Sequence, residues 1–424
     1  MSMSDIRRVE KLDHELNAVV SVPGSKSIAN RALICAALAD GVSEVNGVPD
    51  GDDTEAMIEC LNLLGARIER TGTTVSFRSA IDLDRKDLLT LDARLAGTTA
   101  RFLTAVCGLI SGPTLITGQK SLLSRPMNDL HQALLSIGVQ VEWKGDAGNL
   151  PAVVHRGKTS GSTVELPGTI SSQFTSALML ISPALPLGLS LSILGEVISQ
   201  PYIDMTASVM RHFGARVQEG VSKTTISSGG YRGSSFHVEP DASSSSYPLA
   251  AAAIVGGSVE IVGLGKESIQ GDAKFAELLS RMGCDVEYTQ HSVSIRRVKS
   301  RQLQGIDVDM RDMSDLVPTL AAVAVYASTP TTIRGVGFIR SKESNRIDDL
   351  VHELRSIGVD AIASSDGLIV HPSEVQGGLV ETHHDHRLAM AFALIGLGSG
   401  GVSISDPTGV KKRWPGYWSM LEGL

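Results

Sequence analysis

The sequence is organised as a repeat of about 70 residues, and this repeat limits the possible folds more than any other feature. Six Ala-rich segments with helical patterning begin 71 to 74 residues apart, near Ser27, Thr98, Ser172, Ser244, Asp315 and His386. A second series of helical segments ends in Gly before a strand-like run, at Gly65, Gly138, Gly214, Gly283 and Gly358. Because this period is longer than that of solenoid repeats, we expect subdomains grouped into globular lobes.

Two Pro-containing segments, "SVPGSKS" and "HVEPDASSSSY", interrupt the repeat. Each has a Pro followed by small residues, which is typical of an irregular crossing between domains. We therefore expect two similar lobes of three units each: residues 23–240 in one, and residues 1–22 with 241–424 in the other. The alternating patterns predict a mixed α/β class, and the Ala-rich segments, which are apolar on nearly every side, predict buried helices.

Composition excludes several function classes. The net charge of -8 and an aromatic content of 4% disfavour nucleic acid and anionic membranes as partners. The four cysteines show no C-x-x-C spacing, and the N-terminal segment has no apolar signal region, so a cytoplasmic protein with reduced cysteines is expected. The apolar stretch "LMLISPALPLGLSLSIL" is broken by Pro and Gly and predicts helix, turn and strand rather than a membrane span.

Basic residues gather at the predicted helix starts, where the helix dipole is already positive. Each such cation weakens its helix by about 0.3–1 kcal/mol unless an anion binds nearby. Several of these starts together predict a receptor for phosphate and carboxylate groups. Ser, Thr and Asp at the same starts are equally typical of ordinary N-caps, but capping does not explain the Lys and Arg residues.

Other motifs carry weaker signals. "PGSKS" lacks the glycines of a nucleotide P-loop, and no G-x-S-x-G nucleophile motif occurs. "THHDHR" places His383, His384 and His386 close together without a second ligand cluster, so no metal is expected. Cys107 follows an apolar helical run and is interpreted as a core residue.

A series of motifs in chain order resembles the 5-enolpyruvylshikimate-3-phosphate synthase family. The motifs are "PGSKSIANRALICAALA", "AGTTARF", "SRPM", "SSQFTSALML", "SQPYIDMT", "SKESNRI", "DHRLAMAF" and "KKRWPGYW". The resemblance implies two lobes of three βαβαββ units each, an inside-out α/β barrel with the active site in the cleft between the lobes. It implies transfer of the enolpyruvyl group of phosphoenolpyruvate to the 5-hydroxyl of shikimate 3-phosphate, releasing phosphate, without a cofactor. A monomer is expected.

The resemblance also implies roles for individual residues. The catalytic set is Lys26, Asp315, Glu343 and His386. Within it, Asp315 is the expected general base and Glu343, with Lys26, the acid that protonates the methylene carbon of phosphoenolpyruvate. The phosphoenolpyruvate site falls on Lys26, Gly97, Arg125, Gln173, Arg346, Arg387 and Lys412. The shikimate 3-phosphate site falls on Lys26, Ser27, Arg31, Ser171, Ser172, Gln173, Ser199, Tyr202, Asp315 and Lys342.

Two positions depart from the family's pattern. Leu95 and Phe338 stand where members often carry Asn, so each removes a side-chain hydrogen-bond donor. Gly97, the position linked in the family with room for phosphonate inhibitors such as glyphosate, is retained. We therefore expect altered affinity or inhibitor response before loss of activity.

Three alternatives remain open. A UDP-N-acetylglucosamine enolpyruvyl transferase shares the fold and donor but usually has a Cys before the equivalent of Arg125-Pro126, and the loop here reads "GQKSLLSRP". A noncatalytic binding paralogue would be expected to have lost some of Lys26, Asp315, Glu343, His386 and Arg387. Nucleic-acid binding is disfavoured by the acidic charge and the few aromatic residues.

Overall fold

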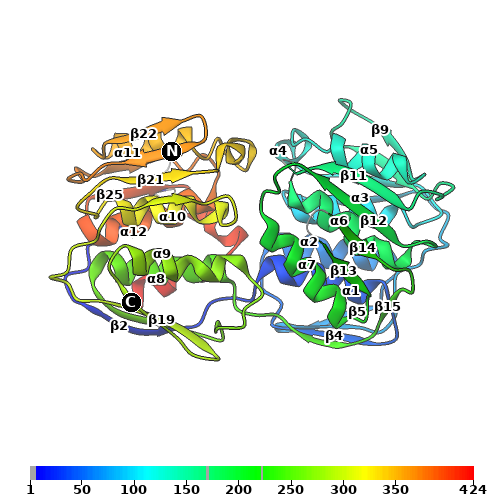
Figure 1. Ribbon diagram of the computed structural model, residues 1–424, viewed down its shortest axis with the longest axis horizontal. Coiled ribbons are helices and arrows are strands. Elements are labelled where there is room, and N and C mark those ends of the chain that lie inside the picture. The colour runs from blue at the N-terminus through cyan, green and yellow to red at the C-terminus, as the bar shows by residue number, and fades with distance from the viewer. Residues whose placement is uncertain (1–5, 169–170, 221–222) are drawn as a thin grey trace. The chain divides into compact units, whose positions relative to one another are not determined.

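The chain folds into two compact units, each of which has its own core. The structure is a computed structural model that describes residues 6–168, 171–220 and 223–424. The first unit is Gly24–Glu239, and the second unit joins the chain up to Pro23 with Pro240–Leu424. Figure 1 shows the chain coloured from blue to red along its length.

In the described part of the first unit, three four-stranded sheets share one strand order, and a short pair of strands is added to them. The bounds, in sheet order, are β16 (Ser235–His237), β4 (Ser43–Asn46), β6 (Thr74–Phe77) and β5 (Ile68–Thr71); β7 (Leu89–Asp92), β8 (Thr114–Thr117), β10 (Ala152–His155) and β9 (Gln140–Trp143); β11 (Thr163–Pro167), β12 (Leu189–Leu194), β14 (Lys223–Ile226) and β13 (Val217–Glu219); and the pair β15 (Tyr231–Arg232) and β3 (Ala39–Asp40).

Within each four-stranded sheet, the first two strands are parallel and the others antiparallel. The helices that connect these strands are α1 (Lys26–Ala37), α2 (Asp52–Leu63), α3 (Gly97–Cys107), α4 (Lys120–Leu123), α5 (Asn128–Ser136), α6 (Ser172–Ile181) with the 3-10 turn η2 (Ser182–Ala184), and α7 (Gln200–His212). The order β11, α6, β12, α7, β13, β14 is one complete βαβαββ unit.

The second unit has a similar plan, with two four-stranded sheets and one three-stranded sheet among its described residues. Its sheets are β18 (Asp285–Tyr288), β19 (Ser292–Arg297), β17 (Gly257–Val262) and β2 (Leu16–Val20); β20 (Asp307–Asp309), β21 (Thr331–Arg334), β23 (Gly367–Val370) and β22 (Ala361–Ser364); and β1 (Ile6–Arg8), β25 (Val402–Ser405) and β24 (Gly378–Val380). Strands β1 and β2 of the N-terminal segment pair with β25 and β17.

The helices of the second unit include several short 3-10 turns. Their bounds are α8 (Ala242–Val255), η3 (Gly271–Lys274), α9 (Phe275–Arg281), η4 (Ser314–Leu316), α10 (Val317–Ala324), η5 (Gly337–Ser341), α11 (Asp348–Ser356), α12 (His386–Ser399), η6 (Pro407–Lys412) and α13 (Tyr417–Glu422). Helices α8, α10 and α12 pack on one another and lie between the strands of the unit's sheets (Figure 1).

The Ala-rich segments form the buried helices that their composition predicts. All fourteen residues of α8 are buried, and α1, α3, α6, α10 and α12 are largely buried. Small side chains let these helices approach closely, while the sheets cover them from outside. The five predicted turn glycines, such as Gly65 and Gly283, all have positive φ between helix and strand, where side chains with a Cβ are disfavoured.

The second helix series follows the prediction only in part. The sequence predicts that this series opens near Arg125, Ser199, Lys342 and Lys412. Helix α7 begins at Gln200, next to Ser199, but Lys342, Glu343 and Arg346 precede α11 in a loop, and Lys412 ends a 3-10 turn. One reason is local: Asn345 hydrogen-bonds through its side chain to Asp348, which favours a turn over a helix there. The idea that every basic cluster lies on a helix start was therefore wrong for these residues.

The four cysteines belong to the cores. Cys35, Cys60 and Cys107 are buried in the first unit and Cys284 in the second. Burial raises the pKa of the first three thiols to about 12 and that of Cys284 to about 11. The stretch from Leu178 forms helix, turn and strand as predicted. Among the described residues, the helices are too short or too polar for any of them to span a bilayer.

Candidate active site

In the first unit, Lys26 begins α1 and pairs with a buried acid. Ser25 caps this helix, and the Lys26 Nζ lies 2.6 Å from Asp53 Oδ2 in α2. Thr99 of α3 donates to the Asp53 carbonyl at 3.0 Å, which links the two helix starts. Asp53 is not among the predicted site residues, and an acid in a first helical turn is also typical of ordinary dipole complementation.

A second cluster surrounds the start of α3. A Cβ added to Gly97 would lie 3.0 Å from Arg125 Nη1 and 3.4 Å from Arg101 Nη1. Arg101 in turn donates to Gln173 Oε1 at 2.5 Å. Gly97 thus lies beside the guanidinium groups of Arg125 and Arg101, and Arg101 connects this position to Gln173. Gly97, Arg125 and Gln173 are predicted site residues, whereas Arg101 is not.

Arg31 connects three helices from a fully buried position. Its guanidinium donates to Thr206 Oγ1 at 2.7 Å, Ser176 Oγ at 3.0 Å and the carbonyl groups of Ser27 and Tyr202 at 2.8 and 3.3 Å. These contacts bring the segments that carry Ser27 and Tyr202 together. Arg31 therefore orders the predicted shikimate 3-phosphate residues as well as belonging to that set.

The remaining predicted residues of the first unit lie at two other helix starts. Ser171 caps α6 by accepting from the Gln173 backbone N–H at 3.4 Å, and Ser172 is the first residue of that helix. Ser199 precedes α7 with φ 58°, a left-handed conformation that costs a non-Gly residue energy. Such strain at a buried polar residue is a recurrent property of binding sites.

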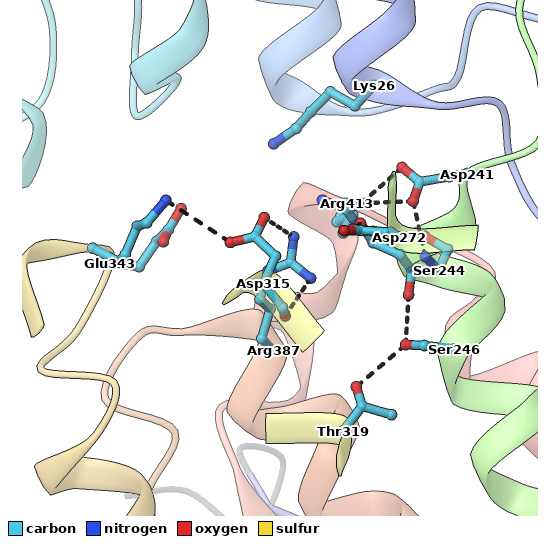
Figure 2. Close-up of polar contacts among 12 residues, drawn as sticks. Lys26, Asp241, Ser244, Ser246, Asp272, Asp315, Thr319, Glu343, Arg387 and Arg413 are labelled. Carbon is cyan, nitrogen blue, oxygen red and sulfur yellow. Dashed lines mark hydrogen bonds and ion pairs between the residues drawn. The ribbon is translucent and has the colours of Figure 1, made fainter. Parts of the chain in front are cut away.

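In the second unit, three cations surround Asp315. Arg387 donates to its Oδ2, Arg346 Nη1 lies 3.2 Å from its Oδ1, and Lys342 Nζ lies 3.9 Å from the same oxygen. Figure 2 shows Asp315 facing Arg387, with Glu343 on the neighbouring loop. Lys342 also lies 6.0 Å from the centroid of the Phe338 ring, so the residue that replaces the family's Asn lies near a predicted site residue.

Glu343 lies between two more cations. Its Oε2 accepts from Arg346 Nη2 at 2.6 Å, and its Oε1 lies 3.9 Å from Lys412 Nζ. Arg346 therefore contacts both predicted proton-transfer residues, Asp315 and Glu343, from a fully buried position. The second unit brings together all of its predicted residues of opposite charge.

Asp385 holds this arrangement together. It caps α12 through the Arg387 N–H at 2.9 Å and accepts from Arg346 Nε at 2.8 Å. His386, a predicted catalytic residue, is the buried first residue of α12. Asp385 stood inside the quoted motif, but its contact with Arg346 spans 39 residues of sequence and left no local signal.

The neighbouring histidines have other partners. His383 Nε2 lies 2.8 Å from Glu353 Oε1, and the His384 side chain is 95% exposed. Among the residues that the structure describes, no group of three His, Cys, Asp or Glu side chains could hold a metal ion.

The charges around Asp315 control its protonation. Burial alone would raise the pKa of Asp315, but Arg387, Lys342 and Arg346 hold it well below its usual range. For Arg346, burial would lower the pKa, but Asp385, Glu343 and Asp315 raise it above its usual value. Both groups are therefore charged at neutral pH, and Asp315 can accept a proton only when its cations are drawn elsewhere.

Asp272, next to this cluster in η3, has the opposite behaviour. It accepts from Ser243 Oγ, and its other oxygen is buried. Burial and the neighbouring Asp315 raise the pKa of Asp272 to about 6. An acid whose pKa is higher in the folded state makes the protein less stable as pH rises through the interval between the unfolded and folded values.

We predict that Asp272→Asn stabilises the protein above pH 6. The carboxyl pKa is about 3.8 when unfolded and about 6 when folded, so ionisation costs about 3 kcal/mol of unfolding free energy at neutral pH. Chemical denaturation at pH 4 and pH 7.5 would measure this gain, which should nearly vanish at pH 4. Equal gains at both pH values would contradict the assignment.

Comparison with solved structures places this fold in a known class. An EPSP synthase structure from Acinetobacter baumannii matches with a TM-score of 0.82 at 25% identity, over 98% of this chain and 97% of that one. The enolpyruvyl transferase NikO from Streptomyces tendae shares the fold, with a TM-score of 0.74 at 18% identity over 99% and 97% of the two chains. The two units of βαβαββ repeats therefore have the enolpyruvyl transferase fold.

The chain belongs to the EPSP synthase (3-phosphoshikimate 1-carboxyvinyltransferase) family, whose sequence model matches residues 11–421. A 3-phosphoshikimate 1-carboxyvinyltransferase from Trichormus variabilis is 38% identical over 98% of both chains. One from Methanosphaerula palustris is 39% identical over 95% of both. The resemblance stated from the motifs is thereby confirmed for family and fold.

Proposed function

We propose that the residues described above transfer the enolpyruvyl group of phosphoenolpyruvate to the 5-hydroxyl of shikimate 3-phosphate in the shikimate pathway to aromatic amino acids. Membership of the family supports the reaction, and the clustered cations support anionic substrates. The observation that supports the proposal most strongly is that the buried Arg346 contacts both Asp315 and Glu343. A site with an acid and a base held by one shared cation suits coupled proton transfers.

Both substrates are bound through their anionic groups. Phosphoenolpyruvate, which carries a phosphate and a carboxylate, is bound by the forks of Arg125, Arg346 and Arg387 with Lys26 and Lys412, next to Gly97 and Gln173. Shikimate 3-phosphate is bound by Lys26, Ser27, Arg31, Ser171, Ser172, Gln173, Ser199, Tyr202, Asp315 and Lys342. Lys26 belongs to both sets.

The chemistry follows from moving two protons. Glu343, with Lys26, gives a proton to the methylene carbon of phosphoenolpyruvate while Asp315 takes the proton of the 5-hydroxyl, and the hydroxyl oxygen bonds to the cationic C2. Glu343 then removes a proton from the new methyl group and the C2–O bond to phosphate breaks. The departing phosphate takes the proton from Asp315, and the surrounding cations stabilise its charge.

Substrate binding makes Asp315 a better base. In the ligand-free arrangement Arg387, Lys342 and Arg346 keep its pKa well below its usual range. The substrates' carboxylate and phosphate groups compete for the same cations, which weakens their attraction for Asp315 and raises its pKa. Proton abstraction is therefore coupled to the arrival of both substrates.

The activity is tested by phosphate release from phosphoenolpyruvate with two acceptors in separate reactions. Release with shikimate 3-phosphate alone is the expected result. Release with UDP-N-acetylglucosamine alone would assign the other transferase, and release with neither would assign a noncatalytic binding protein. We also propose that the protein works in the cytoplasm as a monomer of 44.8 kDa. Gel filtration of the same sample tests the oligomeric state, and elution as a single chain is the expected result.

Gly97→Ala is expected to weaken inhibition by glyphosate more than it weakens substrate binding. The added methyl group would lie 3.0 Å from Arg125 Nη1, so the guanidinium must move by a few tenths of an ångström. We expect the inhibition constant for glyphosate to rise about tenfold or more, since one methyl group in a closed site costs about 1–3 kcal/mol. Competition kinetics against phosphoenolpyruvate measure this effect. The control is Gly145→Ala, at an exposed position where the nearest atom to the added Cβ is Pro151 Cδ at 3.4 Å.

A further inference from the structure

Arg413 follows Lys412 directly and lies in a buried ion pair. Its Nη2 donates to both carboxylate oxygens of Asp241 at 2.7 Å, and its Nε lies 3.4 Å from Ser244 Oγ. The two side chains are only 5% and 3% exposed. Figure 2 shows Arg413 beside Asp241 and Ser244 at the start of α8. None of these three residues belongs to the predicted site.

The acid of this pair is itself fixed. Asp241 caps α8 by accepting from the Ser244 N–H at 2.8 Å, and its own N–H donates to the Pro23 carbonyl at 2.8 Å. Burial would raise the pKa of Asp241, but Arg413 and the Ser244 N–H hold it below its usual range. The carboxylate is therefore ionised and offers Arg413 a charged partner in one position.

The backbone around Lys412 is anchored on both sides. Val410 is fully buried, and its carbonyl accepts from the N–H groups of Arg413 and Trp414 at 3.0 and 2.8 Å. Between these points, Lys412 reaches to 3.9 Å from Glu343 Oε1. The residue before it, Lys411, is exposed. The bond from Arg413 to α8 thus fixes the peptide that carries the Lys412 side chain.

The same turn of α8 also reaches the helix that follows Asp315. Ser246 Oγ donates to the Ser243 carbonyl at 2.6 Å and lies 3.3 Å from Thr319 Oγ1 in α10 (Figure 2). The first turn of α8 is therefore a common support for the segments that carry Lys412 and Asp315. A buried ion pair adds little net stability by itself, so its value lies in fixing geometry.

We propose that Arg413 and Asp241 are positioning residues that hold Lys412 in place for phosphoenolpyruvate. Arg413 acts through the backbone of Lys412. The proposal rests on the proposed role of Lys412 in binding phosphoenolpyruvate. A positioning role differs from that of an ordinary structural arginine, because loss of Arg413 should change the affinity for phosphoenolpyruvate selectively.

The test compares the KM values of both substrates in Arg413→Met, Arg413→Lys and Lys412→Met. In Arg413→Met the KM for phosphoenolpyruvate is expected to rise about tenfold or more, as small misplacements of a binding group can cost up to about 10²-fold. The KM for shikimate 3-phosphate should change less than about twofold by the same argument. Arg413→Lys keeps the positive charge but loses the planar fork of the guanidinium group, so its KM for phosphoenolpyruvate should lie between those of the wild type and Arg413→Met.

Two controls separate positioning from stability. Arg297 is equally buried in the second unit, but it donates to the backbone carbonyl groups of Ala253 and Ile254. Arg297→Met should lower Tm without a selective change in KM, and Lys411→Met should change neither. If Arg413→Met folds poorly, the double variant Asp241→Asn, Arg413→Met removes both buried charges and should recover stability while keeping the raised KM.

The outcomes also separate this inference from the proposed site. If Lys412→Met leaves the KM for phosphoenolpyruvate unchanged, the role of Lys412 is wrong and the inference falls with it. If Lys412→Met raises that KM but neither Arg413→Met nor the double variant does, only the positioning role is overturned. Equal rises in both KM values for Arg413→Met would show a general structural effect and would also overturn it.

Discussion

Glu343→Gln should lower kcat by about 10²–10⁴-fold, the range expected for loss of a general acid. The side chain keeps its size, and the amide oxygen can still accept from Arg346 Nη2, which lies 2.6 Å from the carboxylate. Binding of phosphoenolpyruvate should therefore change little. What the variant lacks is a proton that it can give to the methylene carbon of the substrate.

Hydrogen exchange at that carbon tests the role directly. In D2O the wild-type protein should introduce deuterium into the methylene group during turnover, because protonation gives a methyl group that then loses a proton. NMR should show no such incorporation with Glu343→Gln. Glu277→Gln, at an exposed position on α9, is the matched control for loss of one carboxylate. Rapid incorporation by Glu343→Gln would assign the acid to another residue.

Lys26→Met is expected to reduce kcat/KM by at least about 10²-fold, the effect typical of losing one group that stabilises transition-state charge. The variant also leaves Asp53, which is 4% exposed, without the cation 2.6 Å away. Breaking a buried pair on one side commonly costs about 3–5 kcal/mol, so a loss of activity alone would be ambiguous. A second substitution resolves the ambiguity.

The double variant Lys26→Met, Asp53→Asn removes the buried charge together with its partner. It should recover most of the unfolding free energy lost in Lys26→Met, because the buried negative charge is removed together with the positive charge of Lys26. Activity should stay low if Lys26 acts on the substrates. Recovery of activity in the double variant would mean that Lys26 serves only to neutralise Asp53.

The fold could be predicted because the repeat is visible in the sequence. The six Ala-rich helix starts, for example at Ser172 and His386, lie where the 71 to 74 residue period puts them. Their burial follows from apolar patterning on nearly every side. The loops before α11 and α13 were harder to predict from the sequence. Asn345 and the Pro415-Gly416 pair make these two helices begin later in the chain, and the hydrophobic period gives no sign of such local effects.

The residues that support the site were harder to find. Asp53 meets Lys26 across 27 residues of sequence, Asp385 meets Arg346 across 39, and Asp241 meets Arg413 across 172. Each acid also caps or opens a helix, a local role that explains it fully without the partner. When a charged residue both acts at a helix start and forms an ion pair with a residue distant in the sequence, a single sequence reveals only its role at the helix start.

The burial of all four thiols gives the protein a built-in reporter of local opening. A thiol with a pKa of about 11 or 12 reacts negligibly with an alkylating reagent until its surroundings open and expose it. Cys35, Cys60 and Cys107 report on the first unit and Cys284 on the second. Timed alkylation read by peptide mass would therefore give separate opening rates for the two units, with and without substrates, in the unmodified chain.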